Sequence, residues 1–178
     1  MLQRILSCLL VLLLAGPSLA DIRQGPLVRS LEAGIICPPE SVATSPAPDT
    51  LAGETHIITE DPPFVSNSLI VPAALGVGFG IKAQSEAPGG LSGMIVRVTH
   101  PPMGEAGRTS QSFISSMSGE APSITFYQFD HAYELVKGTW TISAFAGDTE
   151  LLAVTFEVVD PRLVPELASA CNFTDMLS

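Results

Sequence analysis

The chain has 178 residues and a formal net charge of −10, from 18 acidic and 8 basic residues. This acidic balance, without a cluster of Lys or Arg, argues against binding to nucleic acid or to anionic membrane surfaces. The length fits a single domain that can bury a sizeable core.

The first twenty residues have the layout of a secretory signal peptide. Arg4 precedes an apolar run from Ile5 to Leu14, and the small residues Ser18 and Ala20 close the segment. We expect cleavage after Ala20, which makes the mature protein periplasmic or secreted. A retained anchor is the weaker alternative, because the run is short for about 30 Å of hydrocarbon. No later stretch approaches about 20 apolar residues, so no membrane span is expected after cleavage.

The cysteines of the mature chain predict one disulfide. Cleavage removes Cys8 and leaves Cys37 and Cys171. In an oxidising compartment an even number of cysteines favours a bridge between them. Two free thiols are the alternative, and two distant cysteines are too few for a metal site.

The mature N-terminal segment, residues 21–70, is predicted to be irregular with a possible edge strand. Its stretch "CPPESVATSPAPDTLAGE" (37–54) is rich in Pro, Ser, Thr and Ala and has neither a helical nor a strand period. The following "ETHIIT" (54–59) has the composition of a short edge strand. The C-terminal tail, residues 161–178, is expected to add at most one short helical turn.

Residues 71–160 change to short β-branched or aromatic runs separated by Gly, Pro and Ser. The six runs are "LGVGFGIKAQ", "GMIVRVTHP", "RTSQSFISS", "SITFYQFD", "TWTISAFA" and "LLAVTFEVV". Their spacing of roughly 8–15 residues, without a helical period between them, predicts an antiparallel all-β sandwich or barrel. The glycines of "GVGFG" (76–80) are interpreted as sites of close packing or of a bulge.

The last two runs predict a hairpin with a defined register. An odd loop, Gly147–Thr149, places both apolar sets on one side of the pair, whereas a two-residue Gly147-Asp148 turn would separate them. The expected pairs are Trp140 with Phe156, Ile142 with Val154, and Ala144 with Leu152. Trp140, the only tryptophan, is therefore predicted to lie in the core with Ile142, Val154 and Phe156 rather than to stack on a ligand.

Residues 126–160 resemble the end of a bacterial family known as domain of unknown function 3859. The matching positions are Phe129-Asp130, Glu134-Leu135-Val136, Gly138, Trp140 and Phe156-Glu157-Val158, and "VPAALGVGFGIKAQ" (71–84) is similar to the start of the family's pattern. The likeness covers roughly residues 70–160. It implies a small, exported, immunoglobulin-like antiparallel β-sandwich of about six to eight strands, and it offers no catalytic residues.

A direct search for catalytic and metal-binding patterns favours neither. His56, His100 and His131 are far apart, and none has a ligand-type partner at helical spacing. Asp130, His131 and Glu134 in "FDHAYE" are the best candidates for a binding site, although a polar turn between two strands is the simpler interpretation. The chain also lacks a Gly-x-Ser-x-Gly elbow and a phosphate-binding glycine loop. No catalytic residue, cofactor or metal is predicted.

Two classes of function remain. The favoured class is an exported, non-catalytic interaction or accessory module, expected to be a monomer, with an unidentified protein or envelope partner. The alternative is a periplasmic protein that binds a small molecule or a metal ion through the turn at Asp130, His131 and Glu134.

Overall fold

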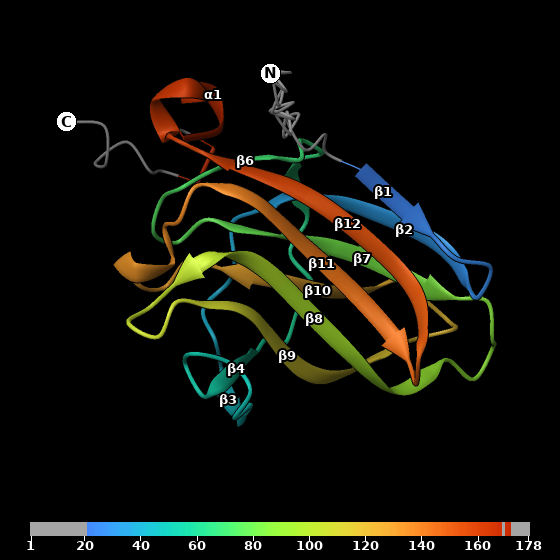
Figure 1. Ribbon diagram of the computed structural model, residues 1–178. Coiled ribbons are helices and arrows are strands. Elements are labelled where there is room, and N and C mark those ends of the chain that lie inside the picture. Colours follow the sequence, from blue (N-terminus) through green and yellow to red (C-terminus); the bar gives the residue numbers. More distant parts are fainter. Residues whose placement is uncertain (1–20, 169, 172–178) are drawn as a thin grey trace, which may run out of the picture.

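The computed structural model describes residues 21–168, 170 and 171, so the predicted signal peptide lies outside the described residues (Figure 1). The described part consists of two packed sheets and a separate two-stranded ribbon. No helix within it is long and apolar enough to cross a membrane.

The first sheet has six strands. Its hydrogen-bonded order is β1 (Asp21–Gln24), β12 (Thr149–Val159), β11 (Gly138–Ala146), β8 (Leu91–Met103) and β9 (Arg108–Met117). The short strand β6 (Ile70–Pro72) pairs in parallel with β12, further along the edge that β1 also uses. Strand β9 is therefore the outer strand on the opposite side of this sheet.

The second sheet has four strands, and the remaining elements are short. Its order is β10 (Ser123–Gln128), β7 (Gly78–Ser85), β2 (Val28–Ile36) and β5 (Phe64–Ser66). The ribbon consists of β3 (Ala43–Pro46) and β4 (Glu54–Ile57). The helical turns are η1 (Ala132–Glu134), η2 (Pro161–Leu163) and α1 (Pro165–Ala168). The two turns near the C-terminus fit the short helical segment expected in the tail.

The order in which the chain visits the two sheets is that of an immunoglobulin-like sandwich. Strands β2 and β7 lie in the second sheet, β8 and β9 in the first, β10 in the second again, and β11 and β12 in the first. Immunoglobulin domains alternate in the same way, with strands A, B and E in one sheet and C, F and G in the other. The prediction of an antiparallel all-β sandwich is confirmed, and its six predicted runs are β7 to β12.

The N-terminal segment 21–70 differs from its prediction as irregular chain. It contains β1 to β6, and the nine-residue β2 lies inside the second sheet between β7 and β5. Its Glu32 stands opposite Lys82 while Ala33 stands opposite Ile81, so charged and apolar residues occupy opposite faces. The sequence hid this strand because Arg29, Glu32 and a glycine interrupt its apolar pattern. The Pro-rich loop likewise contains β3, and the predicted edge strand at 54–59 is β4.

The C-terminal hairpin has the predicted register but a different loop. Trp140 pairs with Phe156, Ile142 with Val154, and Ala144 with Leu152. Ala146 pairs with Thr149, so the turn has two residues, Gly147 and Asp148, rather than three. The register shifts between Ala144 and Phe145, where a bulge in β12 leaves Leu151 without a partner in β11, and Leu151 is the extra residue that the odd loop was expected to provide. Gly147 adopts φ +57°, the left-handed conformation that this turn requires.

The core between the sheets is centred on an aromatic cluster. Trp140 is 0 % exposed, and its indole lies 5.7 Å from the ring of Phe79 and 5.6 Å from that of Phe129, edge to face in both cases. The indole Nε1–H donates to the carbonyl of Val136 at 3.0 Å. Ile142, Val154 and Phe156 are also 0 % exposed. Trp140 therefore has no accessible face for stacking on a ligand.

Gly80 explains how β10 approaches β7. A Cβ atom at this position would lie 2.3 Å from the carbonyl oxygen of Thr125 in β10, a contact that real Cβ atoms do not make. The interpretation of the "GVGFG" glycines as sites of close packing is thereby confirmed at Gly80. The absence of a side chain at Gly80 therefore allows β10 to pair closely with β7 as the outer strand of the second sheet.

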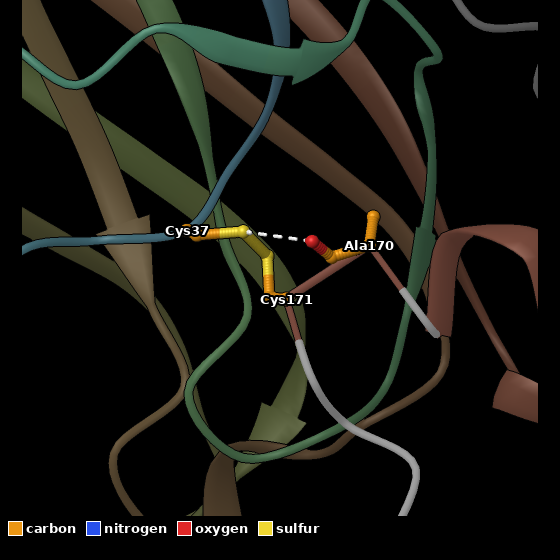
Figure 2. Close-up of a disulfide and its surroundings, with 3 residues drawn as sticks. All are labelled: Cys37, Ala170 and Cys171. Carbon is orange, nitrogen blue, oxygen red and sulfur yellow. Dashed lines mark hydrogen bonds between the residues drawn. A yellow bond between two sulfur atoms is a disulfide. The ribbon is translucent and has the colours of Figure 1, made fainter.

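The predicted disulfide between Cys37 and Cys171 is confirmed. Their Cα atoms lie 5.4 Å apart, within the usual range for a bridge. Figure 2 shows the bridge beside Ala170, whose carbonyl oxygen lies 3.7 Å from Cys37 Sγ. Cys37 directly follows β2, so the bridge ties an inner strand of the second sheet to the C-terminal segment.

Candidate functional site

A groove of about 450 Å³ lies where the two sheets end side by side. Strands β9 and β10 are the outer strands of their sheets, and both line it. The β3–β4 ribbon and the loop between its strands close one end. In Figure 1 the ribbon lies below β8 and β9, apart from both sheets. The gap between the sheets is thus open along β9 and β10.

Much of the groove is apolar. Val98 and Phe113, which contribute to the core, also line the groove. Ile124 and Phe126 from β10 are half-buried, whereas Ile114 from β9 is 79 % exposed. An apolar ligand group entering here would bury surface that now faces water.

The polar end of the groove is acidic. His56 Nε2 lies 2.8 Å from Asp130 Oδ2 and joins the ribbon to the segment that follows β10. Glu54 is exposed beside it, and Glu134 also lines the wall. The lining residues include neither Lys nor Arg. Any charged partner group favoured by this end is therefore a cation.

Glu134 organises the turn predicted from "FDHAYE". Its side chain is buried, at 5 % exposure for the residue. Oε2 accepts hydrogen bonds from the backbone N–H groups of Asp130 at 2.6 Å and His131 at 2.7 Å, and Oε1 accepts from the Tyr127 hydroxyl at 2.6 Å. Charge-assisted bonds of this kind offset the cost of burying a carboxylate. Glu134 is therefore a structural residue of the turn.

The hydrogen bonds continue from Tyr127 toward the tryptophan. Gln111 Nε2 lies 3.4 Å from the Tyr127 hydroxyl and 3.3 Å from His100 Nε2, while Gln111 Oε1 accepts from the Leu51 N–H at 2.7 Å. His100 Nδ1–H donates to the carbonyl of Pro101 at 2.8 Å, and its ring lies 4.8 Å from the indole of Trp140. This series of hydrogen bonds connects the ribbon loop with both sheets.

Two side chains of this hydrogen-bonded series have shifted pKa values. Burial raises the pKa of the Tyr127 hydroxyl, and the bond to the Glu134 carboxylate raises it further. Burial lowers the pKa of His100, partly opposed by its bond to the Pro101 carbonyl. Both groups are therefore held neutral near pH 7, which makes them hydrogen-bonding members of the core.

The lowered pKa of His100 predicts a loss of stability in acid. The unfolded chain binds the proton near the ordinary value of 6.5, above the folded pKa, so the contribution is complete above that pH and falls as the pH drops. His100→Gln is expected to reduce the difference in free energy of unfolding between pH 7.5 and 5.5, measured with urea. An equal difference in the variant and the wild type would contradict this assignment.

The structure brings the predicted binding residues into one turn but uses them differently. Glu134 is occupied by the turn itself, Asp130 lies beside His56, and His131 stacks on Tyr133 at 5.1 Å. Within residues 21–168, 170 and 171, no three His, Cys, Asp or Glu side chains are grouped to hold a metal ion. The roles of His56 and Gln111 are not predictable from the sequence, because both lie in strands distant in the chain from the turn.

Comparison with known families assigns the chain. The family model described as Domain of unknown function (DUF3859) matches residues 24–158. The chain belongs to this family. The matched region of this DUF3859 domain runs from β1 to β12 and so includes both sheets, the ribbon and the groove. The resemblance inferred from residues 70–160 is confirmed, and the match extends further toward the N-terminus.

A solved structure resembles this chain at low sequence identity. One such structure is the crystal structure of an immunoglobulin-like protein from Pseudomonas aeruginosa, with 22% sequence identity and a TM-score of 0.46. The match covers 79% of this chain and 98% of that chain. No curated protein matches the DUF3859 chain significantly. The assignment of the fold therefore rests on the strand pairing described above.

Proposed function

We propose that this DUF3859 protein is an exported, non-catalytic interaction module whose binding surface is the groove between β9 and β10. The observation that carries the proposal is that the groove runs along the outer strands of both sheets. Outer strands carry backbone N–H and C=O groups that can pair with another chain. The proposed partner is an extended segment of another protein.

The polar groups near the groove favour binding over catalysis. Glu134 is held by three donors, and His100 and Tyr127 are kept neutral inside the hydrogen-bonded chain. General acid–base catalysis needs a group that exchanges a proton near the working pH and reaches the substrate. Glu134, His100 and Tyr127 stabilise the fold through their hydrogen bonds instead.

Export is proposed from the signal-like N-terminus. The described residues of β1, Asp21–Gln24, pair with β12 and lie after the predicted cleavage site. Cleavage after Ala20 would leave both sheets intact as far as the structure describes them, because all of their described strands follow that residue. The mature protein is expected to begin at Asp21, and its intact mass after export from the producing cell measures this. A mass that retains residues 1–20 would refute the processing step.

Site-specific photo-crosslinking in the producing cell tests the interaction. A photoreactive amino acid is placed at Ile114 or at Ile124, on the two walls of the groove. The control position is Leu163, which is 73 % exposed and lies in η2 next to α1, away from the groove. Both groove positions are expected to capture the same protein and Leu163 is not. Adducts of equal yield and identity from all three positions, or none from the groove, would contradict the proposal.

The alternative of a small-molecule or metal-binding protein is tested separately. A ligand of the turn that binds only the folded state raises the melting temperature with its concentration. We expect a panel of divalent ions and sugars to leave the melting temperature unchanged. A concentration-dependent rise that Asp130→Asn abolishes would favour the alternative.

A further inference from the structure

The geometry points to a specific partner chemistry: an extended segment that pairs with the second half of β9, inserts an apolar side chain between the sheets, and places a Lys or Arg at the acidic end. This inference rests on the proposed function and adds the strand, the register and the charge of the partner.

Only the second half of β9 is available for pairing. The Ser112 N–H donates to the carbonyl of Asp49 in the ribbon loop at 3.4 Å, and the Arg108 guanidinium donates to the same carbonyl at 3.1 Å. Alternate residues of a strand direct their backbone groups to the same edge. Ile114 and Ser116 therefore direct theirs to the same outer edge as Ser112, beyond the part that the loop covers.

The composition of β9 also differs from that of a protected outer strand. Outer strands are usually guarded by charged residues, proline or bulges against pairing with other chains. In "RTSQSFISSM" the only charged residue is Arg108, at the covered end, and there is no proline. Ile114 stands opposite Ile95, which in turn stands opposite Phe145, so an apolar row leads away from the open edge.

The apolar site for the inserted side chain lies between the two outer strands. Phe113, beside Ile114, is half-buried and packs against the core, and Phe126 from β10 is also among the lining residues. A strand added to β9 directs alternate side chains to the inner and outer sides of the sheet. Its inward residue would lie on the same side of the sheet as Phe113, toward the part of the lining that includes Val98.

Charge decides between the possible occupants. The acidic end carries Glu54 and Asp130, and the groove lining contains neither Lys nor Arg. A second copy of this chain would bring another net charge of −10, which opposes association. A segment with a Lys or Arg gains attraction at Glu54 instead, and opposite charges across an interface also fix the register. The favoured occupant is therefore a basic segment of a different protein.

A display library of random linear dodecapeptides, sorted on the oxidised mature protein, tests this inference. We expect enriched peptides to carry an apolar residue within a few positions of a Lys or Arg. Synthetic copies should bind Ile114→Lys roughly tenfold more weakly than wild type, because the new charge both guards the edge and repels a basic peptide. Leu163→Lys, a change of equal charge at a similarly exposed position, should leave the affinity unchanged.

The charge is tested by Glu54→Gln, which leaves the pair between His56 and Asp130 in place. The affinity of the enriched peptides for this variant is expected to fall about threefold, the effect of losing an exposed ion pair. Peptides sorted on this variant should show no preference for basic residues. Melting temperatures check that each variant is folded, and Glu54→Ala is the second variant if Gln alters the ribbon.

The outcomes separate the two proposals. Enriched peptides that require Ile114 but show no preference for Lys or Arg would overturn the charge inference and leave the interaction module standing. Peptides indifferent to Ile114→Lys would overturn the groove as the binding surface. A dimer in sedimentation that Ile114→Lys dissociates would assign the edge to a second copy and overturn the partner proposed here.

Discussion

Replacing Trp140 by alanine is expected to lower the free energy of unfolding by about 3–5 kcal/mol, the usual range for truncating a buried large aromatic. The indole is fully buried, contacts Phe79, Phe129 and His100, and donates a hydrogen bond to the Val136 carbonyl. Alanine would leave a cavity and an unpaired carbonyl. Urea unfolding of the oxidised protein, followed by circular dichroism because the only tryptophan is removed, measures the change.

Trp140→Phe is the matched variant. It keeps an aromatic ring in the cluster but removes the donor to Val136, so its cost should be clearly smaller than that of alanine. A change below about 1 kcal/mol for alanine would contradict the burial of Trp140. It would restore a ligand-stacking role for this residue.

Removing the disulfide is expected to lower the free energy of unfolding by about 2–4 kcal/mol without loss of the β-sheet signal in circular dichroism. The cysteines are 134 residues apart, and the chain-entropy estimate for such a loop, roughly 5 kcal/mol, is an upper figure. The double variant Cys37→Ser/Cys171→Ser avoids a free thiol. Because the strands pair without the bridge, its circular dichroism spectrum should match that of the wild type while its urea midpoint falls.

Reductant provides the control for this prediction. It should lower the midpoint of the wild type and leave that of the double variant unchanged. Peptide mapping under non-reducing conditions gives the connectivity directly. Recovery of the Cys37 and Cys171 peptides as separate free thiols from exported protein would contradict the bridge and the meeting of β2 with the C-terminal segment.

The parts of the fold that depend on local pattern were predictable from the sequence. The hairpin register followed from the alternation of Trp140 and Ile142 with Val154 and Phe156. Its turn was not predictable, because a bulge at Leu151 changes the relation between loop length and register, and nothing in the local sequence marks it. Strand β2 is not evident from the sequence, because its outward charges, such as Glu32, break the apolar run.

The groove could not be predicted, because it is made by segments far apart in the chain. Its walls come from β9 and β10, its end from the ribbon, and the contact between His56 and Asp130 spans 74 residues. The polar turn was found from "FDHAYE", but the sequence does not show that Glu134 faces inward to Tyr127. Only the packing of the two sheets determines which of these side chains remains accessible.

Amide hydrogen exchange along β9 tests the central claim, that a partner segment pairs with its open edge. In the free protein the amides of Ile114 and Ser116 should exchange quickly, and those of Phe113 and Ser115, which face β8, slowly. A saturating enriched peptide should slow exchange at Ile114 and Ser116 at least about tenfold, as new strand hydrogen bonds form. Unchanged exchange at both amides, with protection elsewhere on the sandwich, would contradict the account.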